Sequence, residues 1–178
     1  TGKWDEISDA YFLKDAGNNV LTLSETNVDA IYELHKGYGA DPRRLNGYVR
    51  DGGDYYFRKF ALTGSATARN YPLIRMTEAY YIAAECLKNT DPARAVELLE
   101  TVRGNRQIEE SLGTLSADEI QTEVYKEYRK EFIGESQLFY YYKRLNASQI
   151  EGTNARPDKS LYVLPVPSND VEFGGYAN

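Results

Sequence analysis

The sequence has few of the residues that most often carry chemistry. Its 178 residues include one cysteine, Cys86, and one histidine, His35. A single cysteine excludes a disulfide within the chain, and a single histidine excludes a carboxylate-bridged di-metal site built from Glu-x-x-His pairs. Ser-His-Asp and Cys-His catalysis would both depend on His35, which lies in no catalytic motif. We therefore expect no catalytic, cofactor-binding or metal-binding residues, and no enzymatic activity.

The chain also lacks a basic surplus and a long apolar run. Its net charge of -6 gives no electrostatic reason to expect nucleic acid as a partner. No apolar stretch approaches the ~20 residues of a membrane helix, and the first ten residues show no signal-peptide pattern. The chain begins with Thr1 rather than Met, so we expect a fragment or the remainder after processing.

Length and composition indicate one globular domain over residues 1–178. Within it we expect a loop-rich segment at 1–70, a helical scaffold at 71–146 and an extended tail at 147–178. We therefore predict a mainly α fold. Its short helices, paired through tight turns, would resemble tetratricopeptide helix pairs, with long irregular loops beside them.

The first helix of this scaffold is expected at residues 77–88. Pro72 disfavours helical geometry at Tyr71, so the helix begins later, near Thr77. An apolar stripe at helical spacing predicts its buried face, and we expect Cys86 to be buried there as a small hydrophobic residue. The stripe consists of Ala79, Ile82, Ala83, Cys86 and Leu87.

Capping signals define the helices that follow. Asp91 and Pro92 begin a second helix that extends to about Asn105. The capping box from Ser116 to Glu119 opens a third. Apolar positions predict that the second helix buries Val96, Leu99 and Val102, and that the third buries Ile120, Val124, Tyr128 and Phe132. The helical pattern continues to Leu145 with a break at Gly134.

The third helix carries an unbroken ladder of glutamates four residues apart. Like charges at this spacing destabilise an isolated helix, although Lys126 and Lys130 relieve part of the repulsion. Two interpretations stay open: a solvated acidic face, or glutamates that meet arginines from other helices. The glutamates are Glu119, Glu123, Glu127, Glu131 and Glu135, and the candidate arginines are Arg75, Arg103, Arg106 and Arg144.

The first half of the chain gives weaker signals. We expect a short strand at residues 20–23 and a loop over 37–69. Residues 30–35 fit either a helix stripe, through Ile31 and Leu34, or strand alternation, through Tyr32 and Leu34, and we favour an extended segment. A short strand at 55–60 and a turn at 51–54 interrupt that loop. Near the C-terminus, two prolines predict an extended segment at 161–167.

Tyrosine is unusually frequent, with 16 residues. A tyrosine offers a flat apolar ring and a polar hydroxyl, which suits the face and rim of a sugar. Tyr38, Tyr55 and Tyr56 lie in the loop-rich segment, and we expect them as ligand-binding residues, although local packing is the default for any one of them.

Six segments, in order, resemble motifs of the SusD/RagB family of surface nutrient-binding lipoproteins. Tyr128 and Ser136 depart from the family pattern, which usually has Arg and Gly there, and the asparagine-rich tail of many members is missing. The six segments are residues 41–43 (Asp-Pro-Arg), 56–60, 71–85 (from Tyr-Pro-Leu-Ile-Arg), 95–103, 127–135 and 164–167 (Leu-Pro-Val-Pro).

This resemblance implies the C-terminal portion of a SusD-like helical scaffold. It implies a non-enzymatic role in capturing an oligosaccharide or other nutrient at the outer-membrane surface, beside a TonB-dependent transporter of the SusC type. A lipid anchor would then belong to an N-terminal part outside this chain. The alternative is a tetratricopeptide-like protein-interaction module without a small ligand.

Overall fold

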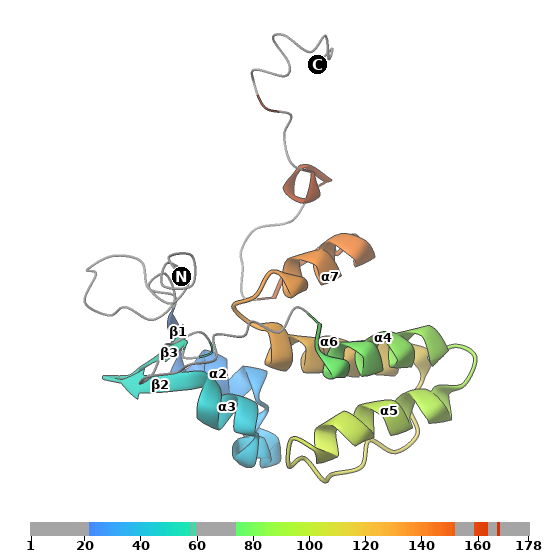
Figure 1. Ribbon diagram of the computed structural model, residues 1–178, viewed down its shortest axis with the longest axis horizontal. Helices are drawn as coiled ribbons and strands as arrows, with labels where there is room; N and C mark the ends of the chain where they lie inside the picture. The colour runs from blue at the N-terminus through green and yellow to red at the C-terminus, as the bar shows by residue number, and fades with distance from the viewer. Residues whose placement is uncertain (1–21, 58, 60–73, 152–158, 164–166, 168–178) are drawn as a thin grey trace. The chain divides into compact units, whose positions relative to one another are not determined.

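A computed structural model describes residues 22–57, 59, 74–151, 159–163 and 167 of the chain. These residues are mainly helical, as predicted (Figure 1). The chain divides into two compact units, Thr1–Gly134 and Glu135–Asn178. The expectation of one domain over 1–178, with its three segments, stays a prediction.

The first described elements are strand β1 (Thr22–Ser24) and helix α2 (Glu25–Ile31). The Ser24 hydroxyl caps α2 by accepting a hydrogen bond from the Asn27 amide at 3.3 Å. Val28, Ile31 and Tyr32 are buried at helical spacing. The predicted extended segment at 30–35 is therefore wrong at its start. Thr22 and Leu23 lie in β1 and confirm this part of the predicted strand at 20–23. Residues 20 and 21 lie outside the described residues.

The structure describes residues 37–57 and 59 of the predicted loop over 37–69, and for most of these residues the loop prediction is wrong. Two short 3-10 turns, η2 (Leu34–Lys36) and η3 (Tyr38–Ala40), lead into helix α3 (Pro42–Gly47). An antiparallel hairpin of β2 (Tyr48–Asp51) and β3 (Asp54–Phe57) follows, and β1 pairs with the other edge of β3. The predicted turn at 51–54 is confirmed: Gly52 has φ 70°, a conformation that glycine adopts at little cost.

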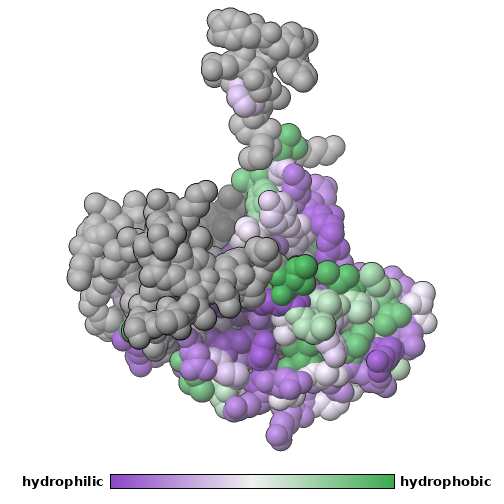
Figure 2. All heavy atoms as spheres, in the orientation of Figure 1, coloured by the Kyte–Doolittle hydropathy of each residue, from purple (hydrophilic) through white to green (hydrophobic). Residues whose placement is uncertain are grey.

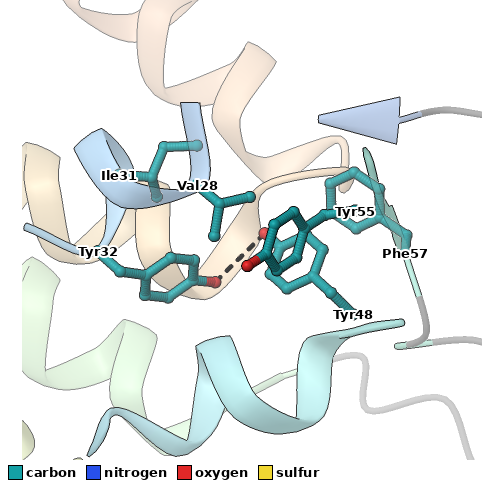
Figure 3. Packing of buried hydrophobic residues seen from close by; sticks show 6 residues of the cluster. All are labelled: Val28, Ile31, Tyr32, Tyr48, Tyr55 and Phe57. Carbon is teal, nitrogen blue, oxygen red and sulfur yellow. Dashed lines mark hydrogen bonds between the residues drawn. The ribbon is translucent and has the colours of Figure 1, made fainter. Parts of the chain in front are cut away.

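An aromatic cluster joins α2 to this small sheet (Figure 3). The Tyr32 and Tyr48 hydroxyls lie 3.3 Å apart, and their rings meet edge to face at 6.0 Å. Tyr48 also packs on Phe57, with ring centroids 4.9 Å apart. The Tyr32 hydroxyl reaches the Lys130 carbonyl at 3.2 Å, so the cluster is fastened to the helical scaffold.

The scaffold contains α4 (Met76–Leu87), α5 (Pro92–Gly104) and α6 (Ala117–Phe132), close to the predicted bounds. Asp91 caps α5, and the Ser116 capping box opens α6, as expected. The predicted core residues of the last two helices are confirmed as buried: Val96, Leu99, Val102, Ile120, Val124, Tyr128 and Phe132.

The predicted buried face of α4 is wrong. Ala79, Ile82 and Cys86 are exposed, and the helix buries Tyr81 and Ala84 instead. The Tyr81 ring packs 5.4 Å from that of Tyr128, and this large amphipathic ring brings more apolar surface to the core than alanine or cysteine. Figure 2 shows hydrophobic atoms on the surface in the region where Figure 1 draws α4.

The second unit contains helix α7 (Gln137–Leu145) and the 3-10 helix η4 (Lys159–Tyr162). The predicted break at Gly134 is confirmed, since this residue has φ 79°. The extended conformation predicted from Leu161 is wrong for the residues within η4. A proline restricts only the residue directly before it, so Pro165 leaves Leu161 and Tyr162 free to form the 3-10 turn.

Candidate functional site

Charged side chains that are almost completely buried lie along and around α6 between Glu123 and Glu131. We call this group the charged core. It links α6 to the segment before α3 and to α5. Its members are Glu33, Asp41, Arg43, Arg103, Glu123, Glu127, Lys130 and Glu131.

Arg43 lies in the first turn of α3 and reaches into the charged core. Asp41 caps this helix by accepting from the Arg43 amide at 2.9 Å, and its carboxylate also binds the Arg43 guanidinium at 2.7 Å. A second ion pair joins Arg43 Nη1 to Glu127 Oε2 at 2.8 Å. Burial alone would lower the pKa of Arg43, but the negative charge of Glu127 and the bond to Asp41 raise that pKa well above its ordinary value.

Glu127 is fully buried at the centre of the core. Its other oxygen accepts from Lys130 Nζ at 3.0 Å and lies 3.8 Å from Arg103 Nη1. Burial would raise the pKa of Glu127, but the charges of Arg43 and Lys130 outweigh it and lower that pKa. One carboxylate thus connects three helices, because Arg43 comes from α3 and Arg103 from α5.

Lys130 is also fully buried, and it binds Glu33 at 2.6 Å. Glu33 has a left-handed backbone, with φ 51°, directly after α2. Burial would raise the pKa of Glu33, but the Lys130 hydrogen bond and charge, with Lys36 and Lys126, lower it to about 2. Glu33 is therefore ionised over the physiological range.

Glu131 lies where the charged core meets the first turn of α4. Its carboxylate is 3.2 Å from Arg106, 3.7 Å from Arg43 and 3.9 Å from Arg75. The hypothesis that ladder glutamates meet arginines is therefore confirmed for Arg75, Arg103 and Arg106, and a solvated acidic face is wrong for the buried glutamates. Arg144 lies over the Tyr141 ring of its own helix, at 5.4 Å.

Sequence reasoning missed Arg43, because its segment was predicted to be loop. A signal was present: Asp-Pro-Arg places a cap, a first-turn proline and an arginine one position later, which is the start of a helix. The charged core contains opposite charges held in pairs. These pairs join α3 and α5 to α6. No group of three or more His, Cys, Asp or Glu side chains that could hold a metal ion occurs in the described part of the chain.

The three tyrosines expected as ligand-binding residues are not gathered in one place. Tyr38 is buried beside the charged core; its hydroxyl donates to Glu110 and accepts from Arg103 Nη2 at 3.2 Å. Tyr55 is buried in the aromatic cluster. Tyr56 is half-buried, and strand alternation turns it to the opposite face of β3. Their role in ligand binding stays a prediction.

A pocket of about 320 Å³ lies between the first turns of α4 and the end of α5. We call it the α4–α5 pocket. It combines apolar surface with hydroxyl, amide and guanidinium groups, the mixture that suits a small polar ligand. Its lining consists of Met76, Thr77, Tyr80, Thr101, Val102, Asn105 and Arg106.

Comparison with known protein families decides how these features are interpreted. The family model described as the SusD family matches residues 24–172, most of the chain. The chain belongs to the SusD family. Comparison with curated proteins and with solved structures found no match. The resemblance predicted from the six sequence segments is thereby confirmed.

Membership in the SusD family indicates a general role. SusD proteins are typically outer-membrane lipoproteins that bind glycans or other nutrients during uptake, and they are generally binding proteins rather than enzymes. In the described parts of this SusD-family chain, no helix combines the length and apolar character needed to cross a membrane. The charged core is then the internal framework of a SusD-type helical scaffold.

Proposed function

We propose that this chain captures an oligosaccharide or a related nutrient, without cleaving it, for an outer-membrane uptake system of the SusC/SusD type. The observation that carries the proposal is the SusD-family match over residues 24–172. In this proposal the protein acts at the outer-membrane surface and delivers its ligand to a TonB-dependent SusC-like transporter.

The buried framework supports a binding role. A glycan-binding surface needs loops held by a rigid scaffold, and the charged core fixes the segment from α2 to α3 against α6 through Arg43 and Lys130. The adjoining small sheet is held by the same helices, because Tyr32 contacts both Tyr48 and the Lys130 carbonyl.

Among the three candidate tyrosines, we propose Tyr56 as the ligand contact. Tyr38 and Tyr55 are buried, Tyr38 beside the charged core and Tyr55 in the aromatic cluster. Tyr56 lies opposite Val49 and Thr22 on the sheet face away from the aromatic cluster, and its ring is only half-buried. An aromatic ring on such a face can stack on the apolar side of a sugar ring.

The test is calorimetric titration of the chain with a panel of oligosaccharides. Tyr56→Ala should weaken binding of the preferred glycan about tenfold, the loss of roughly one aromatic contact. Val49→Ala, on the neighbouring strand, is the matched control and should change the affinity much less. Chromatography of the glycans after incubation should show no cleavage products.

A tetratricopeptide-like protein-interaction module is the second candidate. The exposed stripe of Ala79, Ile82 and Cys86 on α4 favours it, because apolar helix faces often meet other proteins. Co-purification separates the two candidates: a SusC-like transporter supports the first, whereas a soluble peptide partner and no glycan affinity support the second.

A further inference from the structure

We propose that the exposed side of helix α7, with the chain segment packed on it, lies against the anionic surface of a membrane. This inference rests on the proposed function only for the location of the protein at the outer membrane. The surface belongs entirely to the second compact unit. We call it the α7 face, and its members are Phe139, Tyr140, Lys143, Arg144, Leu161 and Val163.

Two aromatic rings are exposed in the first half of α7 (orange in Figure 1). Tyr140 is 63% exposed and Phe139 is 39% exposed, and their rings meet edge to face with centroids 5.7 Å apart. Tyr141 of the same helix is buried, so α7 has an apolar inner side and a second aromatic group on its outer side. Large rings exposed to water gain free energy when they enter an apolar environment.

The 3-10 helix η4 adds to this apolar surface. The Tyr162 ring packs on Phe139 with centroids 6.0 Å apart, and its hydroxyl donates to the Ala147 carbonyl at 3.0 Å. Its neighbours Leu161 and Val163 are exposed. Exposed apolar side chains thus come from two segments that are packed together. Single scattered ones would need no explanation, whereas a group of them marks an interaction site.

The charge of the α7 face selects the kind of partner. Lys143 and Arg144 lie one helical turn after the two exposed rings, on the same side of the helix. Both cations are exposed, and α7 contains no acidic residue, although the whole chain has a net charge of -6. A cationic face on an acidic protein favours an anionic partner.

The composition of the α7 face favours a lipid surface over a glycan. Sugar hydroxyls need hydrogen-bond acceptors, and the Tyr140 hydroxyl is the one side-chain acceptor among the members of this face. A membrane interface instead takes aromatic rings at the level of the headgroups, aliphatic side chains below them, and Lys or Arg at the phosphates. The long stems of Lys143 and Arg144 allow their charges to stay at the headgroups while the rings enter the boundary.

The typical location of the family fits this partner. SusD proteins are typically outer-membrane lipoproteins, and a lipid anchor with a basic interfacial patch holds a protein on a membrane more firmly than either does alone. The anchor also keeps the α7 face close to the bilayer, so that a weak contact is populated. In this proposal the contact fixes the orientation of the second unit on the membrane.

The experiment is co-sedimentation of the full chain with vesicles of phosphatidylcholine, alone or mixed with phosphatidylglycerol in equal parts. We expect binding to the mixed vesicles that falls as salt is added. Binding to phosphatidylcholine alone should be at least about tenfold weaker, because each cation near an anionic surface contributes about a factor of five.

A fluorescent substitution tests whether the face enters the interface. With mixed vesicles, Tyr140→Trp should shift the emission to the blue relative to the unchanged chain, because the indole leaves water for the headgroup boundary. Ile82→Trp, at an exposed position of α4 in the first unit, is the matched control and should show no shift.

Four variants at exposed positions assign the contact to this face. Lys143→Gln should weaken binding to mixed vesicles about fivefold, and Tyr140→Ser should weaken it by a similar factor through the lost ring. Arg94→Gln on α5 and Ile82→Ser on α4 are the matched controls for charge and apolar surface, and they should change binding much less. The urea midpoints of all four should stay close to that of the unchanged chain.

Failure to bind mixed vesicles, or equal binding to both kinds of vesicle, would exclude an anionic lipid surface. Equal losses in the variants and their controls would place the membrane contact elsewhere. Two results without vesicle binding would assign the face to another partner: a dimer in solution that Tyr140→Ser abolishes indicates a second copy, and polygalacturonate binding that it abolishes indicates an acidic glycan. If vesicles do not bind but a glycan binds through Tyr56, the proposed function stands and this inference fails. Vesicle binding through α7 without glycan affinity would have the opposite meaning.

Discussion

Neutralising Glu127 is the sharpest test of the charged core. The Glu127→Gln substitution keeps the size of the side chain and removes its negative charge. Glu127 is fully buried, with Arg43 at 2.8 Å, Lys130 at 3.0 Å and Arg103 at 3.8 Å. The substitution therefore leaves three buried cations with one fewer counter-charge.

The expected cost follows from the partners that remain. Removing one member of a buried ion pair costs about 3–5 kcal/mol, mostly because the other charge stays buried. Here Arg43 keeps Asp41 and Lys130 keeps Glu33, so we expect the lower end, about 3 kcal/mol. This is a large part of the roughly 5–15 kcal/mol that stabilises a domain.

Urea unfolding followed by circular dichroism measures this cost. With a slope near 2 kcal/mol per molar urea, about 3 kcal/mol lowers the midpoint by about 1.5 M. Glu97→Gln is the control: Glu97 pairs with Arg94 at 2.7 Å, but both side chains are more than half exposed. An exposed pair contributes about 0–1 kcal/mol. Equal midpoints for the two variants would refute the reasoning.

Two further predictions concern stability at low pH, through Glu33, and the backbone conformation of Gly134. The pKa of Glu33 is about 2 in the folded protein against an ordinary 4.5, so its contribution to stability is full above about pH 4.5 and is lost as the pH falls toward 2. Unfolding free energies from urea titrations at pH 6 and pH 3 should differ by about 2 kcal/mol through this residue, and the difference should be smaller in Glu33→Gln. The variant Gly134→Ala should cost about 1–3 kcal/mol in the same assay, because this residue has φ 79° and the added Cβ would lie 3.0 Å from Phe57. Gly104→Ala, where an added Cβ meets nothing within 4 Å, should be nearly neutral, and a similar loss in both variants would contradict this account.

The sequence predicted the helices of the scaffold well, because their signals are local. Asp91 with Pro92, and Ser116 with Glu119, are capping patterns that depend on neighbouring residues alone. The apolar spacing of α6 likewise identified its buried face. These local rules also predicted the break at Gly134.

Other features depended on contacts that local patterns do not contain. Which face of α4 is buried was decided by Tyr81 packing on Tyr128, 47 residues away in sequence, and this left Cys86 on the surface. The helix at Pro42–Gly47 is short, and its stability depends on Arg43 reaching Glu127 in α6. The α4–α5 pocket joins residues from two helices, so no sequence motif marks it.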